Sequence, residues 1–277
     1  MRRGVTLLEL AVTMVVFGLV MALVARTAVF HERLQRRERA LADGARAARQ
    51  AVAIVVQAVE GASPGDLIAA ASADSALEIM APMGAGIGCL AGGAVVVAAA
   101  AVDGPGAIWW NSDAKPGDRA LLFDGDAGLA GWQVRTITGV GPGVGGCAIL
   151  GEPPAGATTL YLDAPVGDAP FVGVRIARRT RFTLYRSGDG AWYLGLREWN
   201  PDAGGFNGVQ PVAGPLHARS VLADRTGLLF AYLDSTGRTL PLPLDSAARP
   251  AAIEVTARSA DASATVLHRV VALRHAP

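Results

Sequence analysis

The chain lacks a strong net charge and has almost no lysine. Its 277 residues hold 25 Lys and Arg against 24 Asp and Glu, a formal net charge of +1 at pH 7. Because no excess of positive charge would attract phosphates, this balance argues against a nucleic-acid-binding protein. Lys115 is the only lysine, so arginine carries nearly all the positive charge. Together with the excess of alanine, glycine and valine, this bias is typical of a GC-rich genome and indicates no function.

The sequence also lacks the side-chain patterns that are typical of catalysis or of metal and cofactor binding. The glycine-rich run at 139–146 has no Gly-Lys-Ser/Thr ending, and there is no Gly-x-Ser-x-Gly elbow. The histidines show no zinc-ligand spacing, and an acidic cluster near glycines lacks the spacing of a calcium-binding EF-hand loop. We therefore expect no metal, no cofactor and no enzymatic activity. The residues concerned are His31, His217, His268 and His275, and Asp113, Asp118, Asp124 and Asp126.

Cysteine is scarce as well, since Cys89 and Cys147 are the only two, and each follows a glycine-rich run. A disulfide between them is plausible if this part of the chain lies in an oxidising compartment. Two buried free thiols are the alternative, because sequence cannot show whether the two sulfurs meet in bonding geometry.

One apolar run is long enough to cross a membrane. It extends over 21 residues from Val5 to Ala25, close to the roughly 20 that a helix needs to span about 30 Å of hydrocarbon. Glu9 is the only charged residue between Arg3 and Arg26. Arg2 and Arg3 precede the run and are expected to stay on the cytoplasmic side. This predicts a single-pass protein with its amino terminus inside and everything after Arg26 outside.

Two ordinary kinds of segment compete for this run. A secretory signal peptide would end in a pair of small residues, whereas Arg26 directly follows Ala25 and the helical pattern continues. A plain signal anchor explains everything except Glu9. Near the centre of a membrane helix an acidic residue costs about 2.5 to 3.5 kcal/mol, and less near the interface, so it usually marks a function and a partner. Cleavage after Gly4 would place a positive amine on Val5 and make Glu9 the fifth residue.

The residues Gly4-Val5-Thr6-Leu7-Leu8-Glu9 resemble the prepilin peptidase site of type IV pilins and type II secretion pseudopilins. The resemblance implies that prepilin peptidase removes residues 1–4 after Gly4 and methylates the new amine of Val5. It also implies that Glu9 pairs with the terminal amine of a neighbouring subunit as a filament assembles. Val5 departs from the phenylalanine that is most frequent in the family, but other apolar residues occur there.

Residues 26–60 carry many charges, yet apolar residues recur at helical spacing. This stripe predicts an amphipathic extracytoplasmic helix that continues residues 5–25. We expect the first half of the whole helix to lie in lipid or a filament core and the second half to pack its stripe against the head. The arginines between are expected to be solvated, with contact to lipid headgroups or acidic neighbours as the alternative. Glycine and proline at 61–65 predict the end of the helix. The stripe consists of Phe30, Leu34, Leu41, Ala45, Ala48, Val52, Val55 and Val59.

Residues 61–277 change to short β-favouring runs broken by Gly, Pro, Asp and Asn, which predicts a β-rich antiparallel head and an α+β fold class. Ser187-Gly188-Asp189-Gly190 is expected to form a hairpin turn. With a closing strand at Val270–Arg274, the layout is similar to minor pilins of the PilW type and pseudopilins of the GspJ type. The expected strands are Ala94–Ala101, Arg119–Phe123, Trp132–Thr138, Thr159–Leu162, Val172–Ile176, Arg181–Arg186, Ala191–Trp199, Leu228–Leu233, Ala252–Arg258 and Val266–Leu273.

These features predict a structural minor pilin or pseudopilin of a type IV pilus or a type II secretion filament. Its expected partners are other pilin or pseudopilin subunits, prepilin peptidase, the inner-membrane assembly platform and membrane lipid, with no nucleic acid. The expected location is the bacterial inner membrane with the head in the periplasm, and then the filament. The alternative is a membrane-tethered binding module or enzyme that acts independently of a filament. The sequence does not distinguish a pilus, a secretion pseudopilus and a DNA-uptake filament.

Overall fold

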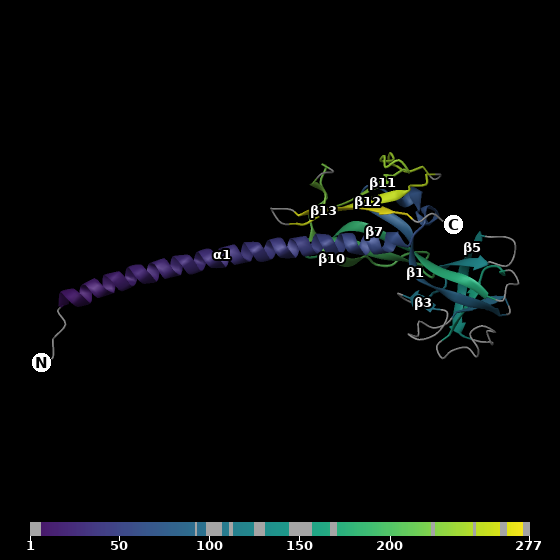
Figure 1. Cartoon of the computed structure of the whole chain (residues 1–277), viewed down its shortest axis with the longest axis horizontal. Helices are drawn as coiled ribbons and strands as arrows, with labels where there is room; N and C mark the ends of the chain where they lie inside the picture. The colour runs from purple at the N-terminus through teal and green to yellow at the C-terminus, as the bar shows by residue number, and fades with distance from the viewer. Residues whose placement is uncertain are drawn as a thin grey trace.

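The computed structural model describes residues 7–91, 93–97, 107–110, 113–124, 131–143, 157–166, 171–222, 225–245, 248–260 and 265–273. In this part of the chain a long helix projects from an antiparallel β-rich head (Figure 1), which confirms the α+β fold class. The helices are α1 (Leu7–Glu60) and two 3-10 turns, η1 (Pro64–Asp66) and η2 (Ala69–Ala71). The strands are β1 (Ala76–Ala91), β2 (Ala94–Val97), β3 (Ala107–Trp110), β4 (Arg119–Asp124), β5 (Gly131–Pro142), β6 (Thr158–Leu162), β7 (Phe171–Arg186), β8 (Trp192–Asn200), β9 (Gly205–Phe206), β10 (Gln210–Leu216), β11 (Leu228–Leu233), β12 (Ala252–Arg258) and β13 (Val266–Ala272).

Helix α1 is long because little in its sequence interrupts it. Its 54 residues contain no proline and only two glycines, Gly18 and Gly44, so it extends about 81 Å at 1.5 Å per residue. It ends at Glu60, where the glycine and proline of 61–65 follow as predicted. The backbone N–H and the hydroxyl of Ser63 then both donate to Asp66 Oδ2, at 2.8 and 2.9 Å. These bonds fix the turn that leads from the helix into the head.

The carboxyl-terminal part of α1 packs inside the head. It contacts β10, at the edge of the large sheet, as well as β12 and β13 of the three-stranded sheet. Figure 1 shows the helix entering the head between these two sets of strands. Its buried side chains join those of both sheets in one hydrophobic core, which includes Val55, Leu77, Phe182 and Ile253. We call this part of the head the helix lobe.

The other part of the head is a closed barrel. Strand pairings run β1–β2, β2–β6, β6–β5, β5–β4, β4–β7 and back from β7 to β1, all antiparallel. Closure removes free sheet edges around this ring. A second core fills its interior with residues such as Val95, Leu122, Ile137, Leu160 and Val174. We call it the barrel lobe, and it lies at the end of the molecule farthest from the amino terminus of α1 (Figure 1).

Two long strands belong to both lobes. β1 and β7 have 16 residues each, and they pair from Ala76 opposite Thr183 to Cys89 opposite Phe171. A register shift between Pro82 and Gly84 marks the passage from one lobe to the other. On its other side β7 pairs with β8 in the helix lobe and with β4 in the barrel lobe. The lobes therefore share a continuous two-stranded spine.

All the expected strands overlap observed ones, with corrections. The expected strands at 172–176 and 181–186 are two parts of the single strand β7. β1, β3, β9 and β10 were not predicted, and residues 98–101 of the expected first strand lie outside the described residues. The hairpin turn is confirmed, since Gly190 N–H donates to Ser187 O at 2.9 Å between the paired strands β7 and β8. Of the expected closing strand, Val270–Ala272 form the end of β13.

Candidate membrane and assembly helix

The projecting part of α1 is exposed on every side. Its most apolar stretch has a mean hydropathy of 2.1 with no buried share, so the helix is long and apolar enough to cross a membrane. Apolar side chains there include Leu10 at 54% exposure, Phe17 at 66% and Leu23 at 67%. A helix that is apolar all round and unburied is typical of a membrane span rather than of a soluble surface helix. Here the structure agrees with the hydrophobic run in the sequence.

The two threonine hydroxyls that the structure describes on this part of α1 are bonded within the helix. The hydroxyl of Thr13 donates to the backbone carbonyl of Leu10 at 2.9 Å, and that of Thr27 donates to Leu23 O at 2.6 Å. Because hydrocarbon offers no alternative partner, such local bonds lower the cost of placing a hydroxyl in lipid. The hydroxyl of Thr13, which lies within the apolar run, therefore does not oppose insertion.

Only the second half of the predicted amphipathic stripe packs against the head. Ala48, Val55 and Val59 have no exposed surface, whereas Phe30 is 63% exposed and Leu34 is 42% exposed. The second half of α1, which was expected to pack its stripe against the head, does so from about Ala48 onward, whereas Leu34 is uncovered. Helical periodicity defines a face but contains no information about where along that face the head begins.

About 20 Å of helix thus separates the membrane segment from the head, since residues 26–40 are all exposed and rise 1.5 Å each. Charged side chains on this stretch form local pairs, such as Arg36 with Glu32 one turn away. Both partners are well exposed, so the pair adds only a few tenths of a kcal/mol to helix stability. This stretch combines wetted charges with the uncovered apolar residues Val29, Phe30 and Leu34.

The residues of the predicted processing and assembly site lie at the very start of the chain. Gly4 and Val5 are outside the described residues. Glu9 lies in the first turns of α1, but its side chain is also outside what the structure describes. Cleavage, methylation and the pairing of Glu9 therefore stay predictions. The helical backbone at Glu9 places this residue at the amino-terminal end of α1, directly before the stretch that is apolar enough to cross a membrane.

The two cysteines give one structural fact. Cys89, on β1, is disulfide-bonded and 3% exposed. Cys147 is the other cysteine of the sequence and lies outside the described residues, so their pairing stays a prediction. A disulfide in the head favours an oxidising compartment, because cytosolic thiols are kept reduced.

The charges that flank the span favour the opposite orientation, with the head in the cytoplasm. Arginine is more frequent after the span than before it, and basic residues favour the cytoplasmic side. By this rule the charge distribution does not support the expected orientation. Before the span lie Arg2 and Arg3, and after it lie Arg26, Arg33, Arg36, Arg37 and Arg39, with Glu32 and Glu38 among them.

The sequence did not reveal a buried ion pair in the head. Arg178 Nε and Nη2 donate to the two carboxylate oxygens of Asp118 at 2.8 and 2.7 Å, and the two side chains are 4% and 5% exposed. Arg178 also donates to the backbone carbonyl of Asp113 at 2.9 Å and to Glu198 at 3.3 Å. Arg178 lies on β7 where the barrel lobe meets the helix lobe, and Asp118 directly precedes β4. No local sequence pattern could identify this pair, because the two partners are 60 positions apart in the chain.

Asp118 belongs to the acidic cluster near glycines that the sequence presents. Asp118 Oδ2 accepts a second bond from the backbone N–H of Lys115 at 2.8 Å, so both its oxygens serve to anchor a loop and an arginine. Asp126 lies outside the described residues. Among the residues that the structure describes, no group of three His, Cys, Asp or Glu side chains is placed to hold a metal ion.

No family model, no curated protein and no solved structure matches this chain.

Proposed function

We propose that this chain is a minor pilin or pseudopilin, a structural subunit of a type IV pilus or a type II secretion-type filament. In this proposal prepilin peptidase cleaves after Gly4, and the processed subunit waits in the inner membrane with its head in the periplasm. The assembly platform then moves α1 from lipid into the helical core of a filament. The head carries no catalytic function.

The observation that carries the proposal is the uncovered length of α1. The helix from residue 7 to residue 40 extends about 50 Å, and residues 10–40 are all exposed, whereas the hydrocarbon of a bilayer covers only about 30 Å. A simple tether needs no rigid extension with uncovered apolar residues such as Phe30 and Leu34 beyond the membrane. Helices of neighbouring subunits would bury these residues together with the membrane segment. The extension therefore favours a filament subunit over an independently acting head.

Glu9 provides the electrostatic part of the proposal. A lone carboxylate in a membrane helix is costly unless a cation accompanies it, and the amine created at Val5 by cleavage is the cation that the resemblance supplies. In a filament the amine of one subunit would neutralise Glu9 of its neighbour. Incorporation would then depend on both cleavage and the charge of Glu9.

Two features of the chain oppose each other on orientation, and we give the disulfide more weight. The arginines after the span favour the cytoplasm for the head, but one of them, Arg36, is paired with Glu32. A disulfide at buried Cys89 requires an oxidising environment during folding. We therefore place the head outside the cytoplasm.

The decisive experiment compares Glu9→Gln with Glu32→Gln in cells that carry the complete assembly system. Each variant removes one carboxylate from the part of α1 that precedes residue 40. We expect only Glu9→Gln to disappear from the sheared filament fraction, while its leader is still removed. Gly4→Ala should block processing, so that the purified protein retains residues 1–4 by intact mass. Normal incorporation of Glu9→Gln, or a wild-type protein that still begins at Met1, would reject the proposal.

The orientation has its own test because the chain contains a single lysine. Lys115 is exposed in the head, so a membrane-impermeant amine reagent should label it in intact spheroplasts. Lys115→Arg is the control that identifies signal from the terminal amine. Labelling that appears only after the membrane is permeabilised would place the head in the cytoplasm and exclude the proposed topology.

The membrane-tethered alternative makes the opposite prediction about the anchor. If the head acts alone, replacing residues 5–25 by an unrelated membrane span without Glu9 should preserve its cellular activity. A filament subunit with that replacement should be inserted in the membrane but should be absent from filaments.

A further inference from the structure

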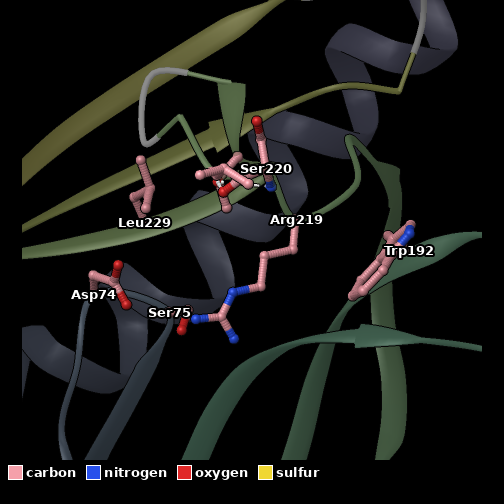
Figure 2. A pocket seen from close by; sticks show the side chains of 8 residues that line it. Asp74, Ser75, Trp192, Arg219, Ser220 and Leu229 are labelled. Atoms are coloured by element: carbon pink, nitrogen blue, oxygen red, sulfur yellow. Dashed lines mark hydrogen bonds between the residues drawn. The ribbon is translucent and has the colours of Figure 1, made fainter.

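A pocket of about 420 Å³ opens in the helix lobe. Three segments that are distant in sequence form it: the turn before β1, the start of β8, and the loop that joins β10 to β11. Its walls include Asp74, Ser75, Trp192, Arg219, Val221 and Leu229 (Figure 2). The volume lies within the range of about 300 to 1,000 Å³ that small-ligand sites occupy.

The loop that carries Arg219 is held in shape by hydrogen bonds. The hydroxyl of Thr226, which is 3% exposed, accepts from the backbone N–H of Ser220 and donates to its carbonyl, both at 3.1 Å. At the base of the loop, His217 N–H donates to Arg258 O at 2.9 Å, and Arg258 N–H donates to Gly227 O at 2.8 Å. A side chain at Gly227 would place its Cβ 2.0 Å from His217 O, so only glycine allows this closure.

The turn before β1, which forms the opposite wall, is also held by hydrogen bonds. Phe230 N–H, on β11, donates to the backbone carbonyl of Asp74 at 2.7 Å. The buried hydroxyl of Tyr232 lies within hydrogen-bond distance of the carbonyls of Ala73 and Ala76, at 3.2 and 3.1 Å. The Arg219 loop is thus anchored to Arg258 at the end of β12, and the opposite wall is anchored to β11.

Arg219 gives the pocket its chemistry. Figure 2 shows its side chain crossing the pocket toward Ser75, with Trp192 on the other side. In the part of the chain that the structure describes, the guanidinium of Arg219 has no hydrogen bond or ion pair, although many other arginines of the head do. A guanidinium is a fork of donors that matches a carboxylate in two parallel bonds.

The remaining walls are suited to an apolar group. The indole of Trp192 and the side chain of Leu229 are partly exposed in the pocket, and Val221 is fully exposed at its rim. Aromatic side chains provide large contact areas for apolar and aromatic ligands. Asp74 adds a negative charge to the side of the pocket opposite Trp192 (Figure 2). That charge disfavours a phosphate or another multiply charged anion, but it tolerates a single carboxylate held by Arg219.

We propose that this pocket binds a monocarboxylate that carries an apolar or aromatic group. The carboxylate is held by Arg219 with help from the hydroxyl of Ser75, and the apolar group lies against Trp192 and Leu229. The same chemistry occurs in a free apolar acid and at the carboxyl terminus of a peptide that ends in an apolar residue. This site is separate from the assembly helix, so the head recognises a ligand irrespective of how α1 is used.

The test uses the full-length protein in detergent micelles and three probes. N-acetylphenylalanine presents both groups, its carboxamide lacks the charge, and acetyl-Gly-Gly-Phe presents the same groups as a peptide end. Binding is followed by the indole N–H resonance of Trp192, assigned with Trp192→Phe. We expect the acid to bind with a Kd of about 1 mM or tighter and its amide to bind at least tenfold more weakly. The peptide binding more tightly than the free acid would identify a peptide end as the source, and the reverse order a free acid.

Two arginines of one loop provide matched variants. Arg219→Gln should weaken the acid about tenfold or more, since a charge-assisted bond is lost, and Arg219→Lys should restore part of the affinity. Arg225 is exposed in the same loop but does not line the pocket, so Arg225→Gln should change the affinity less than about twofold. Both arginines are exposed, and far-UV circular dichroism checks the fold. Four results would each overturn the proposal. These are equal binding of the acid and its amide, the same affinity for the acid in Arg219→Gln as in the wild type, tighter binding of inorganic phosphate than of the acid, and no binding of the acid at about 10 mM.

Discussion

Removing the negative charge of Asp118 tests how the two lobes are joined. Arg178 is almost fully buried on β7, and Asp118 accepts from its guanidinium through both oxygens. The hydrogen bonds to Asp118 are the main reason why the pKa of Arg178 is raised above its ordinary value. Asp118→Asn removes this cause, but the guanidinium stays charged because arginine is protonated in proteins even without a partner, and its counter-charge is gone.

The expected loss follows from this geometry. Removing one partner of a buried ion pair costs about 3 to 5 kcal/mol because the other charge remains buried and uncompensated. Glu198, 3.3 Å from Arg178 and one third exposed, stays to offset part of this cost. We therefore expect Asp118→Asn to lower the free energy of unfolding by about 3 kcal/mol, a large part of the 5 to 15 kcal/mol that is usual for a domain.

Urea unfolding of the full chain in micelles measures this loss through the fluorescence of its five tryptophans. Two further variants serve as comparisons. In Asp118→Leu with Arg178→Met both charges are absent, and we expect most of the stability to return, since a buried pair is often no better than well-packed apolar residues. Glu198→Gln, which leaves Asp118 in place, should cost less than about 1 kcal/mol.

The reasoning would be refuted by a loss below about 1 kcal/mol in Asp118→Asn. It would also be refuted if the double variant were less stable than Asp118→Asn alone. The first result would mean that water or Glu198 fully compensates Arg178, and the second that the pair itself is strongly net stabilising.

Two more changes separate buried from exposed positions. Val55→Ala on the packed half of α1 should lower the free energy of unfolding of the head by about 2 kcal/mol, because it leaves a cavity in the core. Phe30→Ala should change this free energy by less than about 0.5 kcal/mol, because Phe30 is 63% exposed. Urea unfolding measures both changes. Burial raises the pKa of Tyr232, so above pH 10 the unfolded chain loses a phenolic proton that the folded chain keeps. The free energy of unfolding should therefore fall by about 1.4 kcal/mol per pH unit from that residue, starting near pH 10 and continuing toward the raised pKa of the folded state. This slope should be absent in Tyr232→Phe and present in Tyr161→Phe, whose tyrosine is 47% exposed; an unchanged slope in Tyr232→Phe would contradict the assignment.

Local signals in the sequence predicted much of the fold. The apolar run and the helical stripe predicted α1 and its end, because hydrophobic period and the breakers at 61–65 act within a few residues. Alternation predicted strands such as β11 and β12, whose bounds agree with the structure. The turn before β8 was predicted for the same reason, since its glycine at 190 adopts a φ of +84°.

β1 was missed because its composition argues against a strand. It contains Pro82 and several glycines, which are depleted in strands. The structure shows why glycine is needed at position 88, where a Cβ would lie 2.5 Å from Val95 and 2.9 Å from Val174. β1 also contains Glu78, which is 1% exposed and is stabilised there by Arg179 on the paired strand. Tertiary packing overrides local propensity at each of these positions.

The candidate sites also differ in whether local sequence could predict them. The processing motif around Gly4, Val5 and Glu9 is contiguous, so it was recognised from sequence. The pair of Arg178 with Asp118 and the pocket around Arg219 join segments that are far apart in the chain. The pairing of β4 with β7 brings Asp118 to Arg178, and the bond from Phe230 on β11 to Asp74 joins two segments of the pocket. No local pattern encodes these contacts.

The shared spine of β1 and β7 also limits how the protein can be shortened. A fragment that retains the barrel must retain both 16-residue strands, because each closes the ring at one end and supports the helix at the other. Removing α1 from such a fragment would leave Leu77 and Phe182, which are 0% and 2% exposed in the intact chain, without their cover. Deletion of the anchor helix as far as Glu60 is therefore a poor route to a soluble head, and truncation after the exposed stretch, near residue 40, is the better one.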